Sequence, residues 1–265
     1  MKAVILAAGA GTRLQPLTDN TPKCLVEVQG KPLLQYELEA LDWAGVRHCV
    51  LVVGYLSEQV QRKFGHRFGN VQLSYVINER FQETNNLYSL WLAREHLDAD
   101  VLLLEGDLLF EEELLADLRG TYHPDVAVVD KFQDFMNGTA ILAKGNLTVS
   151  MLLKADQSAE FRYQDALKTV NIYKLCRHTM RAQVLPSLDE FVASGQNDQF
   201  YEAVFAQLIR QGQLQLAVHF TGPRQWIEID TIEDLHEAER LFRRVSGSKA
   251  VSAIAAGVRS PLREQ

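Results

Sequence analysis

Residues 2–23 read KAVILAAGAGTRLQPLTDNTPK and carry the clearest structural signal in the chain. The apolar run over 2–8 ends in small residues, which is typical of a fully buried parallel strand. Residues 9–22 are rich in Gly, Pro, Thr and Asn and therefore form a loop. Because open α/β sheets bind ligands outside the carboxyl ends of their strands, this loop lies where a ligand would bind.

Strand and helix signals alternate from this loop to about residue 120. Buried apolar runs predict the strands, and apolar residues at helical spacing predict the helices between them. The alternation predicts an α/β fold with a Rossmann-like, mixed and mainly parallel sheet and helices on both faces. The strands are expected at 48–53, 71–77 and 101–104, and the helices at 32–43, from Ser57, and over a stretch that carries Leu87 to Leu97.

After about residue 120 the strand signals follow one another with little helix between them. The tail over 246–265 is small, polar and mixed, so we expect a flexible tail or a linker there. The elements expected before it are strands 125–129, 139–143, 169–175, 214–219 and 225–230, and helices 186–194, 199–211 and 231–244.

The composition limits the classes of partner. The 265 residues carry a net charge of -7 without any basic run, so we expect no nucleic acid partner. The three cysteines lie far apart, which indicates no disulfide framework. The apolar start of the chain is too short for a membrane span or a signal peptide, so we expect no membrane contact and a cytoplasmic protein.

The loop after the first strand offers a site for an anion. Gly9 and Gly11 let the backbone approach an anion closely and present N–H donors to it. Arg13 and Lys23 add two positive charges, although both could simply be solvated. Two other phosphate loops fit less well, because a dinucleotide-binding turn needs a glycine where Leu14 stands and a Walker loop needs a Gly-Lys-Ser/Thr sequence.

Residues 9–41, GAGTRLQPLTDNTPKCLVEVQGKPLLQYELEAL, resemble the signature of the nucleoside-triphosphate transferases that act on sugar phosphates and related metabolites. The resemblance implies a nucleotide-diphospho-sugar transferase-like fold in which the glycine loop wraps the triphosphate. It implies catalytic roles for Arg13, which polarises the phosphates, and for Lys23, which contacts the reacting phosphoryl groups. The nucleotide-binding residues implied in this region are Leu6, Ala8, Gly9, Gly11, Thr12, Arg13 and Lys23.

Acidic residues in two distant segments suit a divalent cation. Asp107 follows the fourth strand, although it could instead cap a helix that runs from Glu111. Strand alternation places Trp226, Glu228 and Asp230 on one face, and Asp230 could also cap the helix after it. Magnesium prefers one or two carboxylates, with phosphate oxygens and water completing its shell. The resemblance implies that Asp107 and Asp230 hold Mg²⁺, with Glu228 as a further ligand or a neighbour.

Residues 84–90, TNNLYSL, indicate which subgroup of this family the chain resembles. A helix start capped by Asn85 explains the leucines, whereas paired amides can also read the edge of a pyrimidine. The N-N-x-Y-S-L pattern is similar to the bacterial phosphocholine cytidylyltransferases and their relatives that activate aminoalkyl- or hydroxyalkylphosphonates. The resemblance implies CTP as the nucleotide and places Asn85 and Asn86, with Ser89 and Glu105, in its binding site.

The acceptor side is expected after residue 120. The segments KTVNIY at 168–173 and DQFYE at 198–202 resemble the same subgroup, but Tyr201-Glu202 stands where those enzymes carry a tryptophan–aspartate pair. A choline head would need an aromatic cage with a carboxylate nearby, and a primary ammonium would suit Glu202 equally. Tyr201 could instead be a core residue, and Lys131 and Lys168 could each be solvated. The acceptor-binding candidates are Lys131, Lys168, Tyr201, Glu202 and Trp226, with Tyr173 and Phe200 as further rings.

We therefore expect a magnesium-dependent nucleotidyltransferase that moves CMP from CTP to a small phosphorylated or phosphonylated metabolite and releases pyrophosphate. One domain is expected over 1–245, in which 1–120 binds the nucleotide and 120–245 the acceptor, and a homodimer or a fused partner domain is compatible with the sequence. Two alternatives stay open: a hexose-1-phosphate nucleotidyltransferase that uses UTP, TTP or GTP, and a non-catalytic ligand-binding domain of a larger protein. No Ser–His–Asp arrangement supports hydrolase chemistry.

Overall fold

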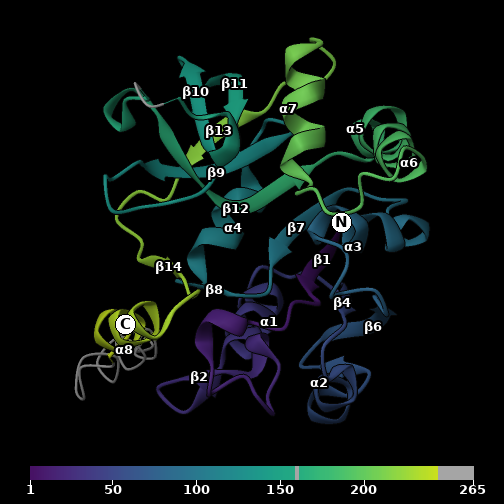
Figure 1. Cartoon of the computed structure of the whole chain (residues 1–265), viewed down its shortest axis with the longest axis vertical. Coiled ribbons are helices and arrows are strands. Elements are labelled where there is room, and N and C mark those ends of the chain that lie inside the picture. The colour runs from purple at the N-terminus through teal and green to yellow at the C-terminus, as the bar shows by residue number, and fades with distance from the viewer. Residues whose placement is uncertain (159–160, 244–265) are drawn as a thin grey trace, which may run out of the picture.

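A ten-stranded sheet of mixed direction forms the centre of the computed structural model, which describes residues 1–158 and 161–243 (Figure 1). The strand order across the sheet is β10-β11-β13-β9-β12-β7-β1-β4-β6-β5. Its strands are β1 (Lys2–Ala7), β4 (His48–Val53), β5 (Arg67–Phe68), β6 (Val71–Ile77), β7 (Val101–Glu105), β9 (Val126–Lys131), β10 (Ala140–Lys144), β11 (Leu147–Leu152), β12 (Leu167–Leu175) and β13 (Ala217–Phe220).

The N-terminal part of this sheet is parallel. β1 pairs in parallel with both β4 and β7, and β4 pairs in parallel with β6. β1, β4 and β7 are nearly continuous apolar runs because both faces of this part of the sheet are buried. The strands expected over the first 120 residues are confirmed, and their carboxyl ends lie at one edge of the sheet.

The C-terminal part of the sheet curls back on itself. β12 runs antiparallel to both β7 and β9, and β10 pairs with both β11 and β12. β13 joins β11 to β9, so the five strands β9, β12, β10, β11 and β13 close into a ring. The mixed sheet is confirmed, whereas its mainly parallel character holds for the N-terminal part, because the short connections after residue 138 join antiparallel neighbours.

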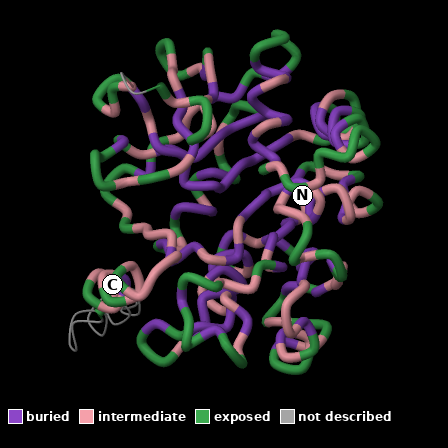
Figure 2. Tube along the Cα trace, viewed as in Figure 1, coloured by how far each residue is buried: buried purple, intermediate pink, exposed green. Residues whose placement is uncertain are grey.

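Helices cover both faces of the sheet, as predicted, and the strands between them are buried (Figures 1 and 2). One face carries α1 (Leu33–Trp43), α2 (Ser57–Phe64) and α4 (Glu113–Gly120). The other carries α3 (Asn86–Leu92), α6 (Leu185–Ala193) and α7 (Glu202–Arg210), and a short α5 (Arg177–Thr179) with a π-helical turn leads into α6. Across the described residues, no helix has both the length and the apolar character needed to cross a membrane.

A small second layer brings the end of the described chain back to the sheet edge. β14 (Trp226–Glu228) pairs antiparallel with β8 (Leu108–Phe110), and β2 (Glu27–Val28) pairs with β3 (Lys31–Pro32). α8 (Ile232–Leu241) packs on these pieces through a separate apolar cluster that includes Leu14, Leu109 and Ile229. The Ile229 N–H donates to the Asp107 carbonyl at 3.0 Å, which fixes the two acidic segments side by side.

The structure corrects several details of the sequence-based interpretation. Asp107 does not cap a helix, because it lies in the turn between β7 and β8, and α4 begins only at Glu113. Asp230 does not cap α8, because the Thr231 hydroxyl accepts from the Asp234 N–H and the Asp234 carboxylate accepts from the Thr231 N–H. β2, β3, β5 and β8, which have two or three residues each, and the six-residue β11 were not predicted.

Gly106 supports the Asp107 turn by allowing close contact with β1. A Cβ at position 106 would lie 2.6 Å from the Ala7 Cβ, so Gly106→Ala is expected to lower the free energy of unfolding by about 1–3 kcal/mol. Urea unfolding followed by circular dichroism measures this loss. Gly120→Ala at the end of α4 is the matched control, because a Cβ there meets nothing within 4 Å, and it should cost nothing. Equal stability of Gly106→Ala and the wild type would contradict the close contact.

Candidate functional site

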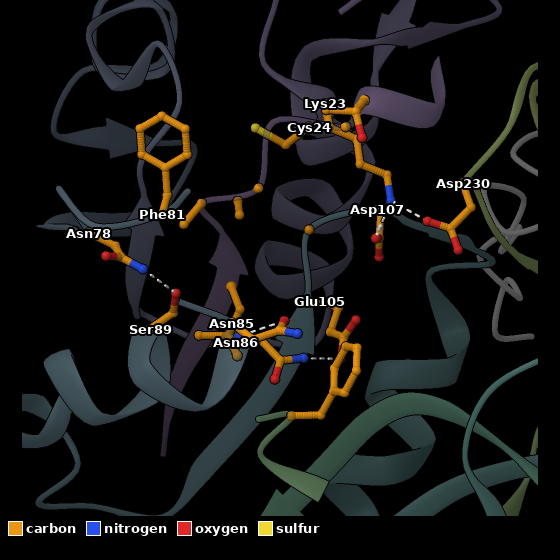
Figure 3. A pocket seen from close by; sticks show the side chains of 18 of the residues that line it. Lys23, Cys24, Asn78, Phe81, Asn85, Asn86, Ser89, Glu105, Asp107 and Asp230 are labelled. Carbon is orange, nitrogen blue, oxygen red and sulfur yellow. Dashed lines mark hydrogen bonds and ion pairs between the residues drawn. The ribbon is translucent and has the colours of Figure 1, made fainter. Parts of the chain in front are cut away.

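A cavity opens at the edge where the carboxyl ends of β1 and β7 meet the start of α3 (Figure 3). It collects residues from five separate segments of the chain. Every residue that the sequence predicted for the nucleotide, catalytic and metal roles lines this cavity: Leu6, Ala8, Gly9, Gly11, Thr12, Arg13, Lys23, Asn85, Asn86, Ser89, Glu105, Asp107, Glu228 and Asp230.

Gly11 allows the glycine loop to pack against Lys23. Its φ of 65° lies in the left-handed region, and a Cβ there would approach the Lys23 Cβ to 2.9 Å. The Thr18 hydroxyl donates to the Gly11 carbonyl at 2.8 Å and holds the loop in this shape. Two short 3₁₀ turns, Thr12–Leu14 and Lys23–Leu25, then carry Arg13 and Lys23 to the same side of the cavity.

Lys23 joins the two predicted metal-binding aspartates. Its Nζ lies 2.5 Å from Asp107 Oδ2 and 2.7 Å from Asp230 Oδ1, and an Arg13 guanidinium nitrogen lies 2.7 Å from the same Asp230 oxygen (Figure 3). Burial alone would lower the pKa of Lys23, but Asp107 and Asp230 outweigh it and hold that pKa above its usual value. Burial would likewise raise the pKa of Asp230, yet Lys23 and Arg13 hold it below its usual value.

A cluster of carboxylates lies next to this ion pair. Glu105, Asp107 and Glu228 each offer an oxygen within 4.8 Å of the others. Asp107 Oδ1 is buried and has no hydrogen-bond partner in the part of the chain that the structure describes. The carboxylate oxygens of this cluster, of which Asp107 Oδ1 is unsatisfied, fit the coordination that magnesium prefers. Burial raises the pKa of both Glu105 and Glu228, as expected for acids that lack sufficient positive charge around them.

Asn78 is a residue of this cavity that the sequence analysis missed. Its amide Nδ2 donates to Ser89 Oγ at 3.0 Å (Figure 3). The same Nδ2 donates to Thr84 Oγ1 at 3.0 Å, and Oδ1 accepts from the Arg80 N–H. The sequence signal that could have revealed Asn78 is its position directly after the strand at 71–77. Residues that follow other strands at this edge of the sheet also line the cavity. The network fixes the side chains at the floor of the cavity.

The two asparagines at the start of α3 have different roles. Asn85 caps α3, because its Oδ1 accepts from the Asn86 N–H at 2.8 Å. Asn86 links two parts of the site, because its Nδ2 donates to Glu105 at 3.0 Å and its Oδ1 accepts from the Tyr201 N–H at 2.9 Å. Both side chains line the cavity, so the helix start and the predicted place beside the nucleotide are compatible.

The five residues predicted to bind the acceptor are not among the described residues that line the cavity. Lys168, Glu202 and Tyr201 are 3%, 4% and 0% exposed, and Tyr201 is part of the core, as the alternative interpretation held. Lys131 is exposed, and Trp226 donates through Nε1 to Asp130 at 2.7 Å. Phe200, which is 50% exposed, lines the cavity.

The chain is similar to known nucleotidyltransferases. Residues 2–123 match the Nucleotidyl transferase family model. Over 243 residues the chain is 33% identical to the CMP-5'-(3-aminopropyl)phosphonate synthase of Streptomyces rubellomurinus, which covers 91% of this chain and 39% of that protein. Over 126 residues it is 43% identical to the choline-phosphate cytidylyltransferase of Streptococcus pneumoniae, covering 46% of this chain and 52% of that protein. The chain thus spans about half or less of these relatives.

A solved structure agrees with these relatives. The CTP:phosphocholine cytidylyltransferase from Streptococcus pneumoniae superposes with a TM-score of 0.75 and 27% identity, covering 91% of this chain and 98% of that one. Open α/β sheets bind ligands outside the carboxyl ends of their strands, and the glycine loop, the two cations and the facing carboxylates of this chain lie there. Residues 2–123 belong to the nucleotidyl transferase family, and the resemblance drawn from the sequence is confirmed.

The ion pair of Lys23 predicts how the free protein binds a divalent cation. Because the Lys23 ammonium neutralises Asp107 and Asp230, it competes with a metal for the same oxygens. Lys23→Met is therefore expected to bind Mn²⁺ about tenfold more tightly in the absence of nucleotide, the factor that about 1.4 kcal/mol produces. Mn²⁺ titration followed by electron paramagnetic resonance measures the affinity. Lys31→Met, which removes a remote lysine paired with Glu39, is the control. Unchanged or weaker binding by Lys23→Met would refute the competition.

The buried Glu202 predicts a pH dependence of stability. Burial raises the pKa of Glu202 to about 7 from its usual 4.5, so the folded protein holds the extra proton between these values. The free energy of unfolding should therefore fall as pH rises from about 4.5 to 7, by up to about 3 kcal/mol for this group. Urea unfolding across this range should give a shallower slope for Glu202→Gln than for the wild type, and equal slopes would contradict the buried acid.

Proposed function

We propose that this protein transfers CMP from CTP to a small phosphorylated or phosphonylated acceptor, with Mg²⁺ as the metal, and releases pyrophosphate. The observation that carries the proposal is the meeting of Asp107 and Asp230 at Lys23, beside the glycine loop. A nucleotidyl transfer passes through a crowded, highly negative phosphorus centre, and an enzyme lowers its energy mainly by positioning and by positive charge. The cavity holds cationic groups and metal-binding carboxylates within a few ångströms of one another.

The choice of CTP rests on the relatives and on the polar floor of the cavity. One relative is named a choline-phosphate cytidylyltransferase and another a CMP-phosphonate synthase. Asn78 donates to Ser89 Oγ, so the Ser89 proton is left to donate to a ring carbonyl of the base. The Asn85 amide, whose oxygen caps α3, adds N–H donors on the same wall. Such donors suit the oxygen and ring nitrogen of cytosine.

The charged residues divide the chemistry between them. Asp107 and Asp230, with Glu228 beside them, would hold Mg²⁺, which when bound neutralises charge that develops at the phosphorus. The Arg13 side chain is 64% exposed and pairs with Asp230 through one guanidinium nitrogen, so its remaining N–H groups can bind the phosphates. Lys23, held at the cavity wall by Gly11, contacts the reacting phosphoryl group.

The reaction needs no covalent enzyme intermediate. An oxygen of the acceptor phosphoryl or phosphonyl group attacks the α-phosphorus of CTP in line with the bond to the bridging oxygen. The new P–O bond forms as the bridging bond breaks, and pyrophosphate leaves with that electron pair. The acceptor oxygen is already ionised near neutral pH, so the protein needs to position it and does not need a general base.

A nucleotide panel tests the proposed reaction. Pyrophosphate release is measured with CTP, UTP, TTP and GTP, each with phosphocholine, 2-aminoethylphosphonate or glucose 1-phosphate and Mg²⁺. We expect turnover with CTP and one of the first two acceptors. Selective use of UTP or TTP with the sugar phosphate would defeat the cytidylyl proposal, and absence of turnover with every pair would favour a non-catalytic ligand-binding domain.

Replacement of the central aspartate tests the metal-binding role. Asp107→Asn should lower the rate by about 100-fold or more, because it removes a charged ligand from the centre that stabilises the reacting phosphates. Asp98→Asn is the control, since Asp98 is an exposed carboxylate that pairs with Lys2. Retained turnover in Asp107→Asn would count against the proposed metal site. Circular dichroism of both variants separates loss of activity from loss of fold.

A further inference from the structure

The loop between the two cationic residues of the site is held from outside the cavity as well as from within. We call residues 15–22, which connect the 3₁₀ turns that carry Arg13 and Lys23, the loop arm. Its inner contact is the hydrogen bond from the Thr18 hydroxyl to the Gly11 carbonyl. Its outer contacts come from α2 and from the turn that precedes this helix.

Tyr55 and Gln59 make these outer contacts. The Tyr55 hydroxyl donates to the Asp19 carbonyl at 2.6 Å, and Gln59 Nε2 donates to the Asn20 carbonyl at 2.9 Å. Asp19 and Asn20 are themselves exposed. Segments with little burial and exposed hydrogen bonds open locally at a low cost in free energy. The two hydrogen bonds therefore influence how often the loop arm leaves this conformation.

The backbone of Tyr55 is fixed at the edge of the sheet. Its N–H donates to the carbonyl of Ala8, the residue directly after β1, at 3.1 Å. The preceding Gly54 allows this approach, because a Cβ there would lie 2.7 Å from the same carbonyl and 2.8 Å from the Phe81 Cβ. Tyr55 thus extends from a closely packed part of the fold to the loop arm.

The ring of Tyr55 contacts a different wall of the same cavity. Its centroid lies 5.9 Å from that of Phe81, and the two ring planes are inclined at 56°. Phe81 lines the cavity with Asn78 and Ser89, on the wall that we propose for the base (Figure 3). Aromatic pairs in tilted arrangements stabilise each other beyond the area that they bury. Tyr55 therefore supports the base wall through its ring and the loop arm through its hydroxyl.

Tyr55 acts on a ligand through its neighbours. It is not among the described residues that line the cavity, whereas Arg13 and Lys23, which flank the loop arm, do line it. A loop that is already held in its bound shape loses less conformational entropy when a ligand binds. The Tyr55 hydroxyl is therefore expected to lower the cost of ordering the loop around the phosphates of a nucleotide.

We propose that Tyr55 is a positioning residue that pre-forms the loop around the triphosphate and joins this loop to the wall beside the base. This inference rests on the proposed function, because it takes the glycine loop as the site of the triphosphate. The hydroxyl acts on the phosphate end of the nucleotide and the ring on the base end, so substitutions can separate the two effects. Tyr55 touches no reacting atom and takes no part in bond making.

Two substitutions at Tyr55 test this division. Calorimetric titration with CTP and with tripolyphosphate, both in Mg²⁺, compares the whole nucleotide with its phosphate end alone. Tyr55→Phe removes the hydrogen bond to Asp19 and keeps the ring, so we expect it to weaken the binding of both ligands by the same factor, about fivefold. Tyr55→Leu also removes the contact with Phe81, so it should weaken CTP binding further than tripolyphosphate binding.

Steady-state kinetics give a second readout. Since the loop is ordered once CTP is bound, Tyr55→Phe should raise KM for CTP and leave kcat within about twofold. Gln59→Met, which removes the hydrogen bond to Asn20, should act in the same direction. Tyr75→Phe is the matched control, because the Tyr75 hydroxyl also donates to a backbone carbonyl at 2.6 Å, that of Gly65 at the far end of α2. It should leave both affinities and KM unchanged.

The outcomes separate this inference from the proposed function. Equal tripolyphosphate binding by the wild type and Tyr55→Phe, or an equal loss in Tyr75→Phe, would overturn the role of Tyr55 while leaving cytidylyl transfer intact. A fall in kcat without a rise in KM would overturn it as well, and so would a wild type that binds CTP but no tripolyphosphate. A wild type that binds tripolyphosphate and prefers UTP or GTP to CTP would instead refute the proposed function and leave the role of Tyr55 standing.

Discussion

The site depends on one ammonium group, that of Lys23, held between carboxylates that are 84 and 207 positions away in the sequence. No local preference of the chain brings these three residues together. The parallel strands β1 and β7 place the loop and Asp107 at one edge, and the β8–β14 pair with the α8 packing returns Asp230 to them. The ion pair is therefore a consequence of the whole topology, and any change that shifts β8 changes it.

The electrostatic arrangement explains why so many acids are tolerated in one place. Several carboxylates converge on the cavity. Lys23 and Arg13 pair with Asp107 and Asp230 at 2.5–2.7 Å, and Lys168 lies 3.5 Å from Glu228. Desolvation penalises the remaining acids, and the pKa values of Glu105, Glu228 and Glu202 are raised accordingly. Such an imbalance costs stability in the free protein. It fits a site that is completed by a divalent cation.

The fold class was predicted from the alternation of strand and helix signals, whereas the residues of the cavity wall were predicted largely from the family resemblance. The run at 2–8 and the glycine loop specify a strand end, and the motif at 84–90 specifies a helix start. Asn78 was missed because its role comes from contacts with Thr84 and Ser89 across a turn, which no spacing rule reveals. The closed ring of β9 to β13 was missed as well, since it depends on long-range pairing and a β-bulge in β12 at Asn171, where φ is 60°.

The acceptor side was the hardest to predict because burial cannot be read from residue type. Tyr201 and Lys168 suggested ligand contacts, yet one is core and the other is paired inside the protein. The link between the two sides is made by the start of α3. Asn86 binds the Tyr201 N–H, and the backbone N–H groups of Asn85 and Leu87 donate to the carbonyls of Asn197 and Gln199.

This link has a consequence for the site as a whole. The segment that begins α7, and with it Glu202, is hydrogen-bonded to the helix that lines the nucleotide wall. A nucleotide that orders the start of α3 therefore also orders the position of Glu202, through three hydrogen bonds of 2.9–3.3 Å. Since binding energy spent on order at one place lowers the cost of order at a coupled one, a ligand that binds the start of α3 is expected to order the start of α7 as well.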